Sequence, residues 1–149
     1  MKNVLVIMGS KSDDKNLEGC YTMLDKFDLS YEVVVASAHR NPEGVLSIAK
    51  NANKNYQVII AAAGKAAHLP GVIAGHTILP VIGVPMNTSD LGGLDSLYSI
   101  VQMPKGVPVA TVAINGSHNA AILAAQIIAG QYKSIQKKLL EYKEELKQG

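Results

Sequence analysis

The stretch Val4-Leu5-Val6-Ile7-Met8, followed at once by Gly9-Ser10-Lys11-Ser12-Asp13, sets the fold class of this chain. Its first five residues are all apolar, which is typical of a strand buried on both faces of a parallel sheet. The glycine and the two serines that follow are typical of a loop leading into a helix. The stretch therefore predicts the first strand-loop-helix unit of an α/β protein.

The same pattern recurs along the chain, where apolar runs of strand length alternate with helix-length segments. We expect five strands: Val4–Met8, Tyr31–Ala36, Gln57–Ala62, Val81–Val84 and Val109–Ile114. Parallel strands joined by helices form a sheet that is covered on both faces. The sequence predicts an α/β three-layer sandwich with a five-stranded parallel sheet, flavodoxin-like or Rossmann-like, as a single domain over 1–149.

Helix signals fill the intervals between the strands. The first helix is expected to run from Ser12 as its N-cap to about Phe27, and the second to begin at Pro42. A short helix should start near Leu69, and a fourth should cover about 95–102. Each predicted helix lies between two predicted strands, as a doubly wound sheet requires.

The last helical region begins at Ser117 or Asn119. Its first half, Ala120–Ala129, is apolar nearly all round, so we expect it to be buried, with a contact between subunits as one way of burying it. The segment 130–149 is predicted to be a C-terminal amphipathic helix. Its apolar stripe must cover a surface of the same chain or of a neighbour, and consists of Ile135, Leu139, Tyr142 and Leu146.

Composition excludes several classes of function. The net charge of +2 comes from a C-terminal region that also carries glutamates, which indicates a solvated helix face and no nucleic-acid patch. No apolar run approaches the length of a membrane span, and the single Cys20 cannot form an internal disulfide. We expect a cytoplasmic protein that binds neither membrane nor nucleic acid.

In an open parallel sheet, ligands bind beyond the carboxyl ends of the strands, so the loops there are the candidate site. Gly9–Asp13 offers free backbone N–H groups at a helix start, which suits a phosphate, although a turn of this kind, taken alone, more often serves only to cap a helix. The loop matches neither the Walker pattern nor the dinucleotide fingerprint, so ATP and dinucleotides are poorly supported. Ser37-Ala38-His39-Arg40 is either an acid/base beside an anion-binding group or a solvated loop.

The third strand leads into a run of small residues that lets a flat ligand approach the backbone, and this run ends at His68. His68 either faces that ligand or caps the following helix. The stretch 86–94 is a lid, a subunit contact or an ordinary surface loop. No histidine has the i+3 or i+4 partner of a helical metal site, so no metal is expected. The sequence also lacks the G-x-S-x-G elbow that would support serine hydrolysis. His76 and His118 are given no role.

Five segments, taken together, resemble the PurE family in its N5-carboxyaminoimidazole ribonucleotide mutase branch. They span most of the chain in order: Gly9–Asp13, Ser37-Ala38-His39-Arg40-x-Pro42, Ala66-Ala67-His68-Leu69-Pro70-Gly71, Pro80–Pro85 and Asp95–Pro104. The resemblance implies conversion of N5-carboxyaminoimidazole ribonucleotide to 4-carboxyaminoimidazole ribonucleotide in purine (IMP) biosynthesis. It further implies that ATP, biotin, metal and other cofactors are not used, and that a homo-octamer has its sites between subunits.

The resemblance also assigns roles to residues. His39 is the expected general acid/base, and we count His68 with it as catalytic. Ser10, Ser12, Asp13, Ser37 and Arg40 are expected to hold the ribose and phosphate. The remaining residues expected to bind substrate are Ala38, Ala63, Gly64, Lys65, Ala67 and Leu69. The small residues Ala63, Gly64, Ala66 and Ala67 are expected to form a wall that confines CO₂ while it moves between nitrogen and carbon.

Two departures from the family pattern stand out, because Ala62 and Lys65 each occupy a position where glycine is usual. An inward Lys65 would bind a carboxylate or phosphate, an outward one would be surface, and we expect the outward orientation. The 115–119 loop is also shorter than in many relatives. Two other functions stay open: the carboxylase branch, which adds CO₂ directly to aminoimidazole ribonucleotide, and a non-catalytic nucleotide- or flavin-binding module.

Overall fold

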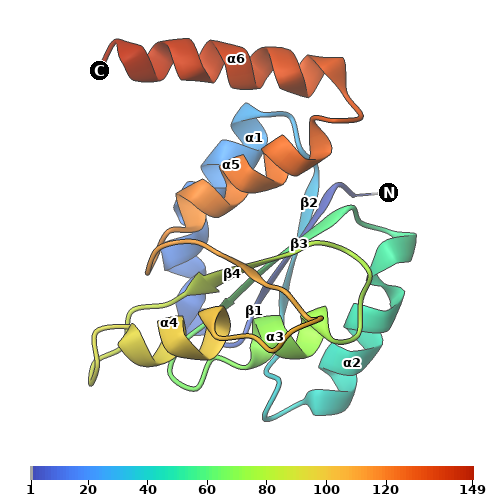
Figure 1. The fold of residues 1–149 in the computed structure, drawn as a ribbon, viewed down its shortest axis with the longest axis vertical. Coiled ribbons are helices and arrows are strands. Elements are labelled where there is room, and N and C mark those ends of the chain that lie inside the picture. The colour runs from blue at the N-terminus through green and yellow to red at the C-terminus, as the bar shows by residue number, and fades with distance from the viewer. Residues whose placement is uncertain (1) are drawn as a thin grey trace.

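A computed structural model describes residues 2–149, in which one parallel sheet lies between two layers of helices (Figure 1). Its strands follow the order β2-β1-β3-β4-β5 across the sheet. Their bounds are β1 Val4–Met8, β2 Tyr31–Val35, β3 Val58–Ala63, β4 Val81–Pro85 and β5 Ala110–Thr111. The predicted five-stranded parallel sandwich is confirmed, and four of the strands end within one residue of the expected position.

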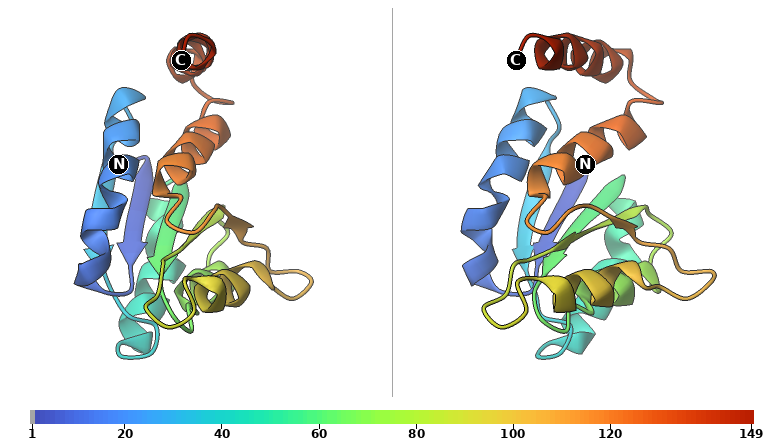
Figure 2. Two further views of the ribbon diagram at one scale, coloured as in Figure 1. Left: turned by 90° about the vertical axis from the view of Figure 1, so that its left-hand side faces the viewer. Right: turned by 60° about the vertical axis from the view of Figure 1, so that its left-hand side comes forward.

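Six α-helices are found in the described residues, three on one face of the sheet and three on the side of the other (Figure 2). Helices α2 Pro42–Asn51, α3 Leu69–Ala74 and α4 Leu94–Val101 cover one face. Helices α1 Glu18–Lys26 and α5 Ser117–Ile128 cover the other, and α6 Lys133–Lys147 lies across their ends. Within 2–149, none of these helices combines the length and apolar character needed to cross a bilayer.

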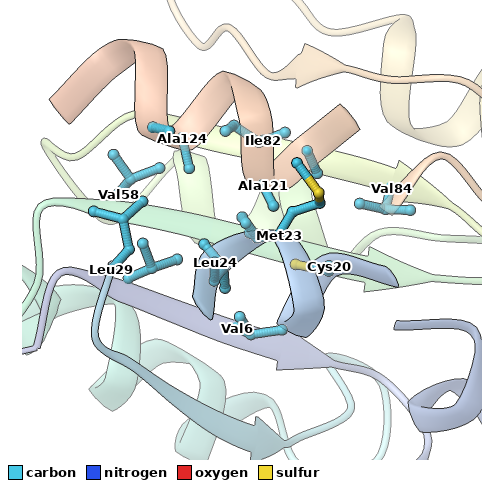
Figure 3. Packing of buried hydrophobic residues seen from close by; sticks show 14 of the residues in the cluster. Val6, Cys20, Met23, Leu24, Leu29, Val58, Ile82, Val84, Ala121 and Ala124 are labelled. Atoms are coloured by element: carbon cyan, nitrogen blue, oxygen red, sulfur yellow. The ribbon is translucent and has the colours of Figure 1, made fainter. Parts of the chain in front are cut away.

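The alternation of side chains along β1 divides the core in two. Val6 and its even-numbered neighbours pack against α1 and α5, as Figure 3 shows, whereas Leu5 and Ile7 pack against α2 and α3. On β4, a Cβ at Gly83 would lie 2.4 Å from the Cγ2 atom of Ile100. Glycine at this position therefore lets α4 approach the sheet closely.

The apolar C-terminal segment is buried within one chain. Its alanines pack α5 tightly against α1 and the sheet, and the fully buried ones are Ala120, Ala121, Ala124 and Ala125. The expected burial is confirmed within one chain for the face that carries these alanines, whereas Ile127 on the same helix is 39% exposed. Ile135, Leu139 and Tyr142 of α6 pack on the same cluster, so the stripe covers its own chain, whereas Leu146 stays 54% exposed.

Three predicted boundaries were wrong for local reasons. Ser10, not Ser12, is the N-cap of the first helical segment, which begins as a 3₁₀ helix at Lys11–Leu17. A break at 129–132 starts the last helix at Lys133, three residues after the expected position. The fifth strand is only two residues long because the regular ladder ends after Thr111. The amides of Val112 and Asn115 bond the carbonyls of Gly83 and Pro85, so this segment uses three residues where β4 uses two.

Candidate active site

The loops that follow β1, β2, β3 and β4 meet around one cavity of about 570 Å³ at the carboxyl end of the sheet. All thirteen residues expected to be catalytic or substrate-binding line this cavity: Ser10, Ser12, Asp13, Ser37, Ala38, His39, Arg40, Ala63, Gly64, Lys65, Ala67, His68 and Leu69. Segments up to 59 residues apart in sequence are thus brought to one place by the parallel topology.

The β1 loop presents hydroxyl groups in a fixed arrangement. The Ser10 and Ser12 hydroxyl oxygens lie 2.9 Å apart, and the Ser10 oxygen also accepts the backbone N–H of Ser12. Burial raises the pKa of the Asp13 carboxyl above its usual 3.8, and a weaker backbone hydrogen bond with Ser10 acts in the opposite direction. The loop therefore combines two hydroxyls with a half-buried carboxyl.

The turn after β2 is tied to the β1 loop. Arg40 donates from Nη2 to the Gly9 carbonyl at 3.0 Å, while its backbone N–H donates to the Ser37 hydroxyl at 3.2 Å. Asn41 then caps α2 by accepting the Gly44 amide, with Pro42 in the first turn of the helix as predicted. The turn therefore places His39 and Arg40 just before the N-terminus of α2, where both side chains line the cavity.

His39 and His68 are in direct contact. A hydrogen bond of 2.8 Å joins His39 Nε2 to His68 Nδ1, and the rings meet edge to face with centroids 4.8 Å apart. His68 occupies the N-cap position of α3, yet its side chain makes no capping hydrogen bond. Of the two roles open to His68, the structure therefore favours the one that faces the cavity.

The backbone of the small-residue run after β3 turns sharply at and after Lys65. Its φ angle of 53° lies in the left-handed region that favours glycine, and the amides of Ala67 and His68 each bond a carbonyl two residues back. Ala62, the other departure from glycine, sits within β3. Lys65 is exposed, and it lines the cavity.

The loop after β4 adds cavity residues that the sequence interpretation had not assigned to the site. Met86, Asn87, Thr88 and Ser89 line it, together with Gly9 and Ala66. Their position could have indicated this, because they directly follow the carboxyl end of a predicted strand, as the other site loops do. Thr88 donates to Asp95 at 2.7 Å and Asn115 accepts the Asn87 amide at 2.9 Å, so the loop is fastened on two sides.

The remaining histidines lie outside this cavity, as expected. His118 lies beside Gly19 and its Nε2 is 3.4 Å from the Tyr142 hydroxyl. Among residues 2–149, no three His, Cys, Asp or Glu side chains are grouped closely enough to hold a metal ion. The chemistry that this cavity displays is thus a histidine pair between hydroxyls, one carboxyl and two cationic side chains.

Comparison with known proteins gives a consistent result. A sequence model described as AIR carboxylase matches residues 3–149. The N5-carboxyaminoimidazole ribonucleotide mutase of Thermotoga maritima is 55% identical over 99% of this chain and 86% of the relative. The protein of the same name from Saccharolobus solfataricus is 52% identical, over 99% and 94%. The crystal structure of Treponema denticola PurE matches with a TM-score of 0.88 at 31% identity, over 97% and 91%.

Proposed function

This chain belongs to the AIR carboxylase family, and we propose that it converts N5-carboxyaminoimidazole ribonucleotide to 4-carboxyaminoimidazole ribonucleotide in purine biosynthesis. The observation that carries the proposal is the contact between His39 and His68 inside a cavity lined by hydroxyls and small residues. The two mutases that resemble it cover nearly the whole chain, and their names describe this isomerisation.

The phosphate and ribose are assigned to the loops of β1 and β2. Ser10, Ser12 and Ser37 offer hydroxyl donors, and Arg40 keeps further N–H groups free after bonding Gly9. A carboxylate repels phosphate but accepts from hydroxyl groups, so Asp13 suits the ribose. These groups hold the nucleotide while the reacting atoms lie beside the histidine pair.

The reaction is proposed to run through CO₂, with His39 as the proton carrier. Protonated His39 delivers its proton to the exocyclic nitrogen as the carboxyl group leaves, and the electron pair of the broken N–C bond stays on that nitrogen. Ring carbon C4 then attacks CO₂, forming the new C–C bond. Neutral His39 removes the C4 proton, which restores the aromatic ring and returns His39 to its starting state. The cycle consumes no other reagent.

The small-residue wall serves this course by confinement. Free CO₂ would diffuse away, whereas a close wall keeps it within reach of C4 and preserves the advantage of an intramolecular step. Ala63, Gly64, Ala66 and Ala67 line the cavity, and none of them has a side chain larger than a methyl group. Because His68 Nδ1 lies within hydrogen-bond distance of His39 Nε2, we assign His68 to orienting the acid/base and exchanging protons with it.

A substrate test separates this activity from its two rivals. We expect the purified protein to form product from N5-carboxyaminoimidazole ribonucleotide without bicarbonate, and to turn over aminoimidazole ribonucleotide only slowly when bicarbonate is added. Faster product formation from aminoimidazole ribonucleotide and bicarbonate would assign the chain to direct carboxylation. Binding without any turnover would indicate a non-catalytic nucleotide-binding module.

We further propose that the enzyme works in the cytoplasm as a homo-octamer. Cys20 is buried and unpaired, as a reducing compartment permits. Several apolar side chains are exposed, which an assembly would bury: Val33, Val35, Ile78, Leu91, Leu94, Tyr98 and Val101. Sedimentation velocity is expected to give a species near eight times the chain mass of 15.8 kDa. A stable monomer with full activity would contradict the proposed assembly.

A further inference from the structure

Lys65 has a backbone conformation that costs free energy. Its φ of 53° places it in the region where a side chain beyond Cα is disfavoured, and glycine is the residue that adopts this region readily. Such strain is retained at functional sites when the side chain contributes something in return. The lysine side chain is therefore expected to have a function at this position.

Within residues 2–149, the ammonium group of Lys65 has neither an ion-pair partner nor a hydrogen-bond partner. Among residues 2–149, the ion pairs join Lys26, Lys137, Lys138 and Lys147 to carboxylates, and none involves Lys65. No side-chain hydrogen bond of Lys65 occurs there either, although the residue lines the cavity. A long, flexible cation at the cavity wall is thus available to a ligand.

The charge balance of the cavity points to an anionic ligand group. Asp13, Arg40 and Lys65 are the lining residues with a full charge apart from the histidines. Arg40 and Asp13 cancel, so Lys65 alone makes this set positive. The proposed substrate carries a phosphate of about −1.5 to −2 and a carboxylate of −1, and one cation is insufficient for both.

The topology assigns the two cations to different ends of the substrate. The order β2-β1-β3 places the loop of Arg40 and the loop of Lys65 on either side of the β1 loop, and the bond between His39 and His68 spans them. Arg40 lines the cavity with the serines, to which the proposed function assigns the phosphate. Lys65 lies within the small-residue run that is to enclose the migrating carboxyl group.

We propose that Lys65 is a specificity residue that binds the carboxylate of the substrate and product, an inference that rests on the proposed function. Because neutral CO₂ has no charge to attract, Lys65 favours the carboxylated species over the CO₂ state. Its contribution therefore appears in the affinity for carboxylated nucleotides and in KM, with kcat unchanged or slightly higher in its absence.

The test compares two ligands that differ in one carboxylate, 4-carboxyaminoimidazole ribonucleotide and aminoimidazole ribonucleotide, by calorimetry. We expect Lys65→Met to bind the first about fivefold more weakly and the second unchanged, because only the first loses a charge-assisted contact. Lys65→Arg should retain the preference. The matched control is Lys11→Met, an exposed lysine of the neighbouring loop that does not line the cavity, and it should leave both affinities unchanged.

A second variant removes the strain as well as the charge. Lys65→Gly is expected to melt at the same or a higher temperature than the wild type and still lose the carboxylate preference. Equal weakening of both ligands would assign Lys65 to the phosphate, and unchanged affinity for both would leave it as surface; either result overturns the inference. Wild-type protein that binds neither ligand would instead overturn the proposed function, and the inference with it.

Discussion

The two ends of the sheet use polar residues in opposite ways. At the amino end, Asn3, Ser30 and Gln57 precede three adjacent strands and satisfy one another: Asn3 accepts the amide and hydroxyl of Ser30 and donates to Gln57 at 2.9 Å. At the carboxyl end, polar side chains surround a cavity, and Lys65 there carries backbone strain. The amino end is organised for stability, and the carboxyl end holds groups available to a ligand.

The largest effect expected at the carboxyl end is that of His39→Asn. Losing the acid/base should lower kcat by about 1,000-fold, within the range for proton-transfer groups. Because His39 is exposed, the melting temperature should change little. Ligand binding should be largely retained. Steady-state kinetics measure the loss of turnover, and calorimetry measures the binding. Intact turnover would remove His39 from its assigned role.

The next effect is that of His68→Asn, which should lower kcat by about 100-fold, because His39 loses its hydrogen-bonded partner. If the two rings act as one unit, the double variant should be hardly slower than His39→Asn alone. The measurement is a double-mutant cycle on kcat. Fully multiplicative losses would show that the two histidines act independently.

A change at the amino end should reverse this pattern. Asn3→Ala removes the groups that bind Ser30 and Gln57, so the free energy of unfolding should fall by about 1–2 kcal/mol. At this chain length that corresponds to roughly 2–6 °C in melting temperature. Turnover well below the transition should be unchanged. A loss of kcat without a loss of stability would abolish the distinction between the two ends.

The sequence predicted the elements at both ends, but not the contacts between loops. Apolar runs and helix-start signals are local, so they placed β1 to β4 and α2 closely. The bond between His39 and His68 depends on β1 lying between β2 and β3, and no local pattern contains that order. The left-handed φ of Lys65 was foreshadowed by the usual glycine, and Met86–Ser89 were missed although they follow a predicted strand.

The smallest expected effect is that of Asp13→Asn, where the carboxyl end gives up stability for function. Burial raises the pKa of Asp13 in the folded state, so the protonated form stabilises the fold and this contribution is lost as pH rises through the folded pKa. Asparagine never ionises. The variant should therefore melt at a slightly higher temperature than the wild type near pH 7, and this difference in melting temperature should close as pH falls toward about 3.8.

The affinity of the same variant for aminoimidazole ribonucleotide should drop, because the ribose hydroxyls of the ligand lose a charged acceptor. Thermal melts across pH and calorimetric titration measure the two changes, and a variant less stable at neutral pH would mean that the Asp13 carboxylate holds the loop together and does not strain it.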